Sequence, residues 1–506
     1  MKTIYKIFKV IIIALVLFMP YSCTDDFDEL NTNPKLITDD IIKPSLLLTK
    51  VMKESGFEIL NSGRTGEFSG YSSRGDSGFP FIFANYDSPF SYYGSHIVNL
   101  SAIIRLTADD PLESNMNAIA RIWKVWVFHR MTDAYGDLPY SDVAKSFDEV
   151  ILSPSYDTQE AIYQNLLNEL KEAAAQLSTN SDQLSYGAAD VLFGGDSDSW
   201  KRLANSLRLR LAIRVRYADQ VLAQTHITDV LSSGAMITSN GENATFTSEG
   251  EDAEDLENTN PLYQSFQNGS AGAGNAIVIG LTLSESMTKT NDPRLSIYLD
   301  PNVDNEYIGK SINLDEIEKF AFAPVTKLDL RFLEAEYDFN VALAAETSLL
   351  RAEAALAGLS SENANSFFQQ GIQLSMEQYG VDAADISTFL ASTAGTLSGT
   401  SEEQLEQIIV QKYVALFGDS FEAWAEHRRT GYPRIWIGST PAPDTDGAMP
   451  RRFAYPISEY NLNGTNINEA VARLTGGDLL KSRIWWDAKA GVPFAHPKQG
   501  TFPPYD

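Results

Sequence analysis

The feature that most constrains this chain is a helical spacing of apolar residues, which recurs along most of its length. Between residues 157 and 177 the apolar side chains fall on one helical face: Ile162, Leu166, Leu167, Leu170 and Leu177. Asp157 and Glu160 stand before this stripe at the spacing of a capping box, and Ser401 and Gln404 stand in the same way before a second stripe. These patterns predict a mainly α-helical protein.

The chain has a single cysteine, Cys23, close to its N-terminus. One thiol excludes internal disulfides, Cys-based zinc sites and iron–sulfur clusters, which need two or more. Before it lie three lysines and an apolar run, Val10–Met19, which is too short to span a bilayer but typical of a secretory signal. Because the small residue Ser22 directly precedes Cys23, we predict a lipoprotein signal peptide over residues 1–22 and a lipid on Cys23.

The rest of the chain, residues 23–506, is predicted to form a single domain. Residues 346–380 are typical of two helices with a turn at 358–361, and small alanines would let these helices approach closely. The length fits the roughly 34-residue tetratricopeptide repeat. Residues 236–325 are rich in acids and glycine, which predicts a loop-rich insertion. The predicted fold class is therefore mainly α, a tetratricopeptide-like scaffold of helical pairs with long loops and a few short strands.

The charge balance argues against nucleic acid as a partner. The chain has 39 basic and 67 acidic residues and a formal net charge of −28, which opposes the neutralisation of phosphates. The predicted helix at 200–217 nevertheless carries five arginines: Arg202, Arg208, Arg210, Arg214 and Arg216. On so acidic a chain we expect these arginines to pair with neighbouring carboxylates.

The search for catalytic or metal-binding motifs gives no candidate. Hydrolase, nucleotide-binding and metalloprotease motifs are absent, and the five histidines lie more than thirty residues apart. Asp190, Asp196 and Asp198 lack the glycine and glutamate of an EF-hand, so we interpret them as a solvated loop. We predict no catalytic residue, no metal and no cofactor. A glycoside hydrolase remains an alternative, because two of the many acids could face each other across a cleft.

A dense group of aromatic residues is the strongest candidate for ligand contact. Nine aromatic residues lie between Phe68 and Tyr93 among Gly, Ser, Asn and Asp, without helical spacing. Such rings either pack the loop onto the helices or stack on sugar faces and apolar ligand groups, and we expect about half to be structural. The predicted ligand-binding residues are Tyr71, Arg74, Phe79, Tyr86, Phe90 and Tyr92. If they prove to be core, the loops between residues 258 and 324 are the next candidate.

Short blocks of characteristic residues follow one another over nearly the whole chain. They are Thr132–Tyr140, Asn205–Arg210, Asn291–Leu295, Gln411–Tyr413, Ala415–Phe417, Glu422–Trp424, Arg428–Gly431 with Pro433, Pro450–Arg452 with Tyr455, Pro456 and Glu459, Asn461–Asn468, and Trp485–Asp487. This ordered series resembles the SusD/RagB family of outer-membrane lipoproteins, in particular its nutrient-binding branch. From the residues alone, Arg428 and Arg429 beside Trp424 are predicted to be structural, with guanidinium groups tied to carbonyls and carboxylates.

The resemblance implies a SusD-like fold, anchored in the outer membrane by its N-terminal lipid and facing the cell exterior. It also implies a SusC-like TonB-dependent transporter as partner. Members of the family hold glycans, or in some cases peptides, and pass them on without cleaving them. We therefore expect a non-enzymatic protein that binds a glycan or oligosaccharide, with peptide binding as the alternative. A surface glycoside hydrolase and a purely structural adaptor are the other hypotheses.

Overall fold

Helices dominate the structure, a computed structural model of the chain. It describes residues 42–60, 63–74, 88–143, 151–251, 258–263, 277–322, 324–440 and 445–504. Residues Pro44–Asp506 form one compact unit. The predicted signal peptide, 1–22, and Cys23 lie outside the described residues.

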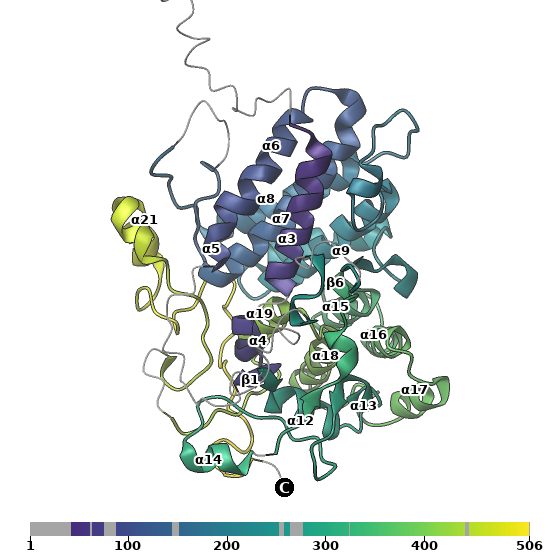
Figure 1. The fold of residues 1–506 in the computed structure, drawn as a ribbon, viewed down its shortest axis with the longest axis vertical. Coiled ribbons are helices and arrows are strands. Elements are labelled where there is room, and N and C mark those ends of the chain that lie inside the picture. Colours follow the sequence, from purple (N-terminus) through teal and green to yellow (C-terminus); the bar gives the residue numbers. More distant parts are fainter. Residues whose placement is uncertain are drawn as a thin grey trace, which may run out of the picture. The chain divides into compact units, whose positions relative to one another are not determined.

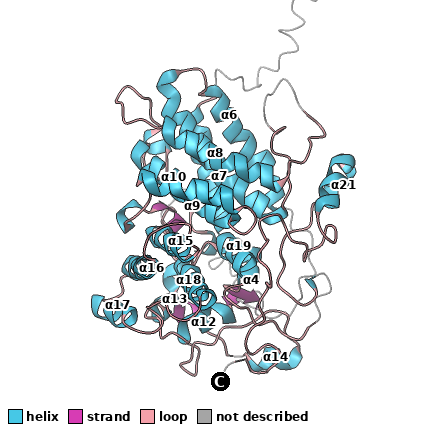
Figure 2. Ribbon diagram, turned by 180° about the vertical axis from the view of Figure 1, so that it is seen from behind, coloured by secondary structure: helices cyan, strands magenta, loops and turns pink. Residues whose placement is uncertain are grey.

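The N-terminal half of this unit is built from helices that pack in sequence order. Helix α7 contacts α8, α8 contacts α9 and α9 contacts α10, while α3 and α6 pack against α7. Helices α6, α7 and α8 lie together in one half of the unit (Figures 1 and 2). The helices are α3 (Pro44–Leu60), α4 (Gly63–Ser69), α5 (Ser88–Tyr92), α6 (Val98–Leu106), α7 (Ser114–Tyr135), α8 (Gln159–Gln176), α9 (Ser197–Val215) and α10 (Gln220–Ser233).

The C-terminal half contains the predicted helical pair. Helices α15 and α16 pack closely, and a turn with Gly358 at φ +71° joins them. The close approach depends on Gly371, where an added Cβ would lie 2.6 Å from the Cγ of Leu349. The prediction of a helical-pair scaffold is therefore confirmed. The helices are α15 (Ala344–Leu356), α16 (Ala364–Gln378), α17 (Ala383–Leu390), α18 (Ser401–Ala415), α19 (Ser420–Thr430), α20 (Ile457–Leu462) and α21 (Gly464–Arg473).

The described strands are short and form three separate antiparallel pairs. Strand β1 (Ser72–Arg74) pairs with β3 (Ile277–Ile279), β2 (Ala244–Thr247) with β6 (Asp338–Ala342), and β4 (Leu299–Asp300) with β5 (Lys327–Leu328). Three short helices, α12 (Leu281–Thr288), α13 (Leu295–Tyr298) and α14 (Glu316–Ala321), lie between them in sequence. Few short strands among long loops is the predicted arrangement. The boundaries of the insertion, 236–325, stay a prediction.

Two predicted helix caps lie one residue away from their true positions. Helix α8 is capped by Thr158, whose side chain accepts the backbone N–H of Ala161. Asp157 instead accepts backbone N–H groups of the loop that follows α7. Helix α18 begins with a capping box of Thr400 and Glu403 in place of the predicted Ser401. In both cases two adjacent residues can accept the bond, and the backbone conformation selects between them.

A cluster of buried ion pairs lies where α7, α9, α15, α18 and α19 meet. At its centre Glu422 is fully buried, with Arg214 Nη2 2.6 Å from Oε1 and Arg130 Nη1 3.2 Å from Oε2. The surrounding pairs are Arg130–Asp419, Arg210–Glu346, Arg214–Glu426, Arg216–Glu353, Arg429–Glu353 and Arg429–Glu426. The arginines of α9 thus pair with carboxylates, as predicted.

Glu422 stays ionised although it is buried, because several cations surround it. Burial alone would raise the pKa of Glu422, but the positive charges of Arg214, Arg210, Lys412 and Arg130 outweigh burial and hold that pKa well below its ordinary value. The carboxylate therefore stays ionised at neutral pH and needs all of its partners.

Replacing Glu422 by Gln should strongly destabilise the protein. The change leaves several buried guanidinium groups with too little negative charge, and breaking a buried pair in this way costs about 3–5 kcal/mol. Urea denaturation measures the free energy of unfolding. The matched control is Glu54→Gln, which removes an exposed pair with Lys50 at 2.8 Å and should cost no more than about 0.5 kcal/mol. Equal effects of the two variants would contradict this assignment.

Stability should also fall in mild acid because of His427. Burial lowers the pKa of His427 to about 4 in the folded protein, against about 6.5 in an unfolded chain. The unfolded state therefore takes up the proton first, so stability is complete above pH of about 6.5 and declines toward pH of about 4.

The measurement is urea denaturation at a series of pH values, with wild type beside His427→Gln. The variant should show a shallower decline. Burial also lowers the pKa values of His129 and His226, and these residues should account for part of the remaining slope. An unchanged slope in the variant would show that His427 does not titrate as described.

Candidate ligand-binding site

A pocket of about 460 Å³ opens between α5, α6 and α20, within the range of roughly 300–1,000 Å³ typical of small-molecule sites. Its walls come from three parts of the chain: residues 90–105, residues 139–143 with 151–154, and residues 459–463. The lining side chains include Phe90, Tyr93, Val98, Ser101, Arg105, Asp142, Ile151, Leu152, Glu459, Leu462 and Asn463. The pocket therefore depends on contacts between distant parts of the chain.

The first wall contains a π-helical turn, Tyr93–Ile97, between α5 and α6. The N–H of Val98 donates to the carbonyl of Tyr93, five residues earlier. Nearby side chains add hydrogen bonds to backbone carbonyls, since Ser95 Oγ donates to Ser91 O at 3.3 Å and Asn99 Nδ2 to Ser95 O at 2.5 Å. Such turns are frequent at functional sites, and this one contributes residues directly to the pocket wall.

Two half-buried aromatic rings form the inner part of this wall. Phe90 meets Tyr93 edge to face at 5.2 Å and Tyr135 at 5.6 Å. The hydroxyl of Tyr93 donates to Pro139 O at 2.6 Å. Burial, and then the charge of Glu459, raises the pKa of Tyr93 well above its ordinary value. The hydroxyl therefore stays protonated and holds the ring in place.

The second wall is a loop that begins where α7 ends. Gly136 adopts φ +93°, which a side chain would disfavour, and its N–H donates to Thr132 O at 2.7 Å. The carboxylate of Asp157 then accepts the backbone N–H groups of Tyr140 at 3.1 Å and Ser141 at 2.7 Å. Asp157, predicted to cap α8, in fact shapes this wall.

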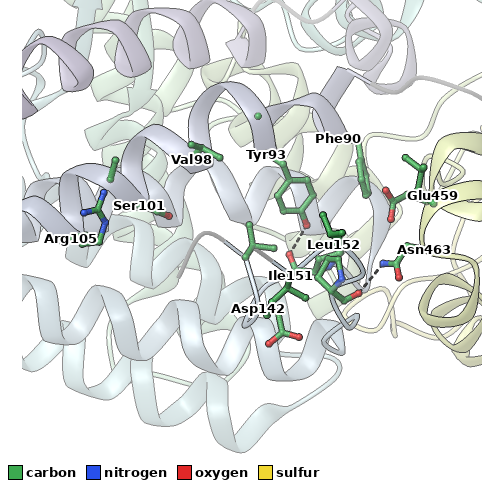
Figure 3. A pocket seen from close by; sticks show the side chains of 16 residues that line it. Phe90, Tyr93, Val98, Ser101, Arg105, Asp142, Ile151, Leu152, Glu459 and Asn463 are labelled. Carbon is green, nitrogen blue, oxygen red and sulfur yellow. Dashed lines mark hydrogen bonds between the residues drawn. The ribbon is translucent and has the colours of Figure 1, made fainter. Parts of the chain in front are cut away.

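The third wall is α20, which is tied to the second by polar contacts. Tyr156 donates to the carboxylate of Glu459 at 2.7 Å, and Asn463 Nδ2 donates to Pro154 O at 2.8 Å. Figure 3 shows Ser101 and Arg105 at one end of the pocket and Glu459 and Asn463 at the other. Ile151 and Leu152 lie between them. The pocket thus has polar groups at both ends and, between them, aliphatic side chains together with the carboxylate of Asp142.

Sequence blocks that carry the family resemblance meet at the C-terminal end of α7. Arg428 donates to Asp133 O at 2.6 Å and Arg451 O at 2.8 Å, and its guanidinium lies 3.5 Å from the ring centre of Trp424. Trp486 Nε1 donates to Asp133 Oδ1 at 2.8 Å. These contacts agree with the predicted structural role of Arg428. They hold the end of α7, from which the second wall of the pocket continues.

The six predicted ligand-binding residues have different positions. Phe90 lines the pocket. Tyr71 and Tyr92 are 4% and 1% exposed, so neither ring offers a face to a ligand. Tyr71 instead stacks on Tyr413 at 4.4 Å. Aromatic residues pack in cores as well as in binding loops, so composition alone does not distinguish the two roles. Arg74 pairs through its backbone in β1. Phe79 and Tyr86 lie outside the described residues.

Several lining residues were not identified from the sequence. Tyr93 belongs to the aromatic group but is not among the six predicted contacts, and Glu459 and Asn463 belong to blocks of the family resemblance. Leu152 is 85% exposed and Leu462 74%, yet nothing in their local sequence sets them apart. An apolar residue in a loop can be identified as a possible ligand contact only when its exposure in the folded protein is known.

The structure also corrects one interpretation of the acidic residues. The sequence predicts a solvated loop around Asp190, but this residue is buried. Its carboxylate accepts the N–H of Gly195 at 2.7 Å and Trp200 Nε1 at 2.6 Å. Within the described ranges, no group of three or more His, Cys, Asp or Glu is placed to hold a metal ion.

The helical-pair fold thus carries an open pocket lined by aromatic, aliphatic and polar side chains. The sequence model of a SusD-like family, described as starch-binding and associating with the outer membrane, matches residues 42–456. The chain belongs to this SusD-like family. The recognition and the fold class predicted from the sequence are confirmed, and the protein is a binding protein rather than an enzyme.

Solved structures support the same assignment. A chitin-binding protein is 27% identical with a TM-score of 0.75, and the match covers 88% of this chain and 100% of that chain. A SusD homologue from Bacteroides uniformis is 26% identical, with the same TM-score and coverage. A SusD homologue from Bacteroides ovatus is 26% identical with a TM-score of 0.73, covering 88% and 98%. Among proteins of curated function, none is similar enough in sequence to count as a match.

A helix that crosses a bilayer must be both long and strongly apolar. Among the residues described, no helix combines the necessary length with sufficient apolar character.

Proposed function

We propose that the protein binds glycans at the outer face of the outer membrane and delivers them to a SusC-like TonB-dependent transporter. The family description, starch-binding and associating with the outer membrane, supports the ligand class and the location. The similar chitin-binding protein supports a glycan ligand as well. Attachment is proposed to occur through a lipid on Cys23, after removal of residues 1–22.

The observation that carries this proposal is the composition of the pocket. Phe90 and Tyr93 are half-buried aromatic rings, and sugars commonly place their C–H faces against such rings. Asp142, Glu459 and Asn463 provide polar atoms in the same pocket, suited to hydroxyl groups. Arg74, Phe79 and Tyr86 stay proposed ligand contacts on the ground of the sequence alone.

Replacing Phe90 by Ala should weaken glycan binding by roughly tenfold, about 1.4 kcal/mol, because the ligand loses a ring of the pocket wall. Isothermal titration with maltooligosaccharides and chitooligosaccharides measures the affinity. The control is Tyr71→Ala, which should lower stability by about 3–5 kcal/mol through lost core packing while leaving the affinity unchanged at a temperature where the variant is folded. Undiminished binding by Phe90→Ala would place the glycan site elsewhere.

Replacing Cys23 by Ala should release the protein from the membrane or trap its precursor, since the acyl chains supply the anchor. Cell fractionation in a strain without the transporter measures this, with Thr24→Ala as the matched control. If Cys23→Ala still fractionates with outer membranes, the anchor is not on this cysteine.

Mild detergent extraction of the wild type should recover a large β-barrel protein in complex with this chain.

A further inference from the structure

We propose that this pocket selects a neutral oligosaccharide whose sugar units carry acyl groups. The inference rests on the proposed function and deepens it, because it specifies the substituents on the bound glycan. Four features of the pocket carry it: exposed aliphatic side chains, a buried hydroxyl, the charge balance and an open glycine.

Four exposed aliphatic side chains lie together around the pocket. Leu152, Leu462, Ile151 and Val98 are 85%, 74%, 46% and 37% exposed, and all four line it. They come from three separate segments of the chain, so their meeting is a property of the folded site. Apolar surface concentrated in this way marks a contact region, since covering it is favourable.

An unmodified sugar matches such walls poorly. A hexose carries hydroxyl groups around its ring, and pressing them against Leu152 or Leu462 would remove their water without providing a partner. An acetyl group instead presents a methyl to the aliphatic side chains. Its carbonyl can be met by a polar group of the wall. Ser101 is 8% exposed and its hydroxyl has no hydrogen-bond partner in the described structure, so it is suited to that role.

The charges of the pocket favour a neutral ligand. Its lining includes two carboxylates, Asp142 and Glu459, and one guanidinium, Arg105. The whole chain carries a net charge of −28. Glycans with carboxylate or sulfate groups would be repelled on approach and inside the pocket.

The walls also differ from a peptide site. Extended peptides are commonly recognised by adding a strand to a sheet edge, where main-chain hydrogen bonds supply affinity. The lining residues belong to helices, loops and the π-helical turn, and none belongs to the described strands. We therefore favour an acylated sugar over a peptide that carries apolar side chains.

Gly94 gives a direct way to test this pocket. It lines the wall within the π-helical turn, and a Cβ added there would meet nothing within 4 Å. Gly94→Leu should therefore occupy the pocket without disturbing the fold. Gly241 lies in a 3₁₀ turn outside the pocket, also with nothing within 4 Å, so Gly241→Leu is the matched control.

The experiment compares probes that differ only in acylation. Isothermal titration is carried out with tetra-N-acetylchitotetraose against cellotetraose, and with O-acetylated against plain maltotetraose. In at least one pair the acetylated probe should bind at least tenfold more tightly to the wild type. Gly94→Leu should lose at least tenfold of that binding, and Gly241→Leu should bind as the wild type does. Thermal melting should confirm that both variants are folded.

Three results would overturn the inference and separate it from the proposed function. Plain oligosaccharides that bind as tightly as their acetylated partners, in a Gly94-dependent manner, would refute the acyl preference and leave the glycan function standing. Absence of binding by every oligosaccharide would refute both. Gly94-dependent binding of an Ala-Leu-Val-Leu peptide, tighter than that of any sugar, would identify the pocket as a peptide site.

Discussion

The buried charges around Glu422 are the interaction on which the rest of the structure depends. Taking an ion out of water costs several kcal/mol, and this cost is offset only when each charge meets its partners at close range. Arg214 and Arg130 approach Glu422 at 2.6 and 3.2 Å. The pairs join helices that are far apart in sequence, so the helices cannot slide without separating charges. This requirement sets the relative positions of α7, α9 and α19.

That rigid centre extends to the pocket through the end of α7. Arg428 of α19 donates to Asp133 O, and Arg452 donates to Tyr135 O at 3.1 Å. Tyr455 then donates to Asp137 O at 2.8 Å. The loop that continues into the second wall is thus fixed by segments more than 290 residues away. Much of what identifies the family in the sequence serves this support.

The pocket itself follows a different physical rule. Its supporting residues, such as Arg428 and Arg452, are buried and hydrogen-bonded, whereas Leu152 and Leu462 remain exposed to water. Polar contacts such as Tyr156 to Glu459 hold the walls together without filling the space between them. A site of this kind can change its ligand preference through exposed side chains while the scaffold behind it stays the same.

The sequence by itself determined the elements whose signals are local. The stripe of α8, the pair α15–α16 with its turn at Gly358 and the pairing of the α9 arginines all follow from spacing and charge. The ordered blocks of residues also identified the family and, through it, the fold.

Only the tertiary structure decided which residues form the site. Tyr71 and Phe90 occur in the same aromatic stretch, but one is core and the other lines the pocket. Glu459 meets Tyr156 across 303 residues, which no local period encodes. The helical spacing of apolar residues indicates which side of each helix faces the core. Burial and the meeting of distant segments arise only when the whole chain packs, and these decided where the pocket lies.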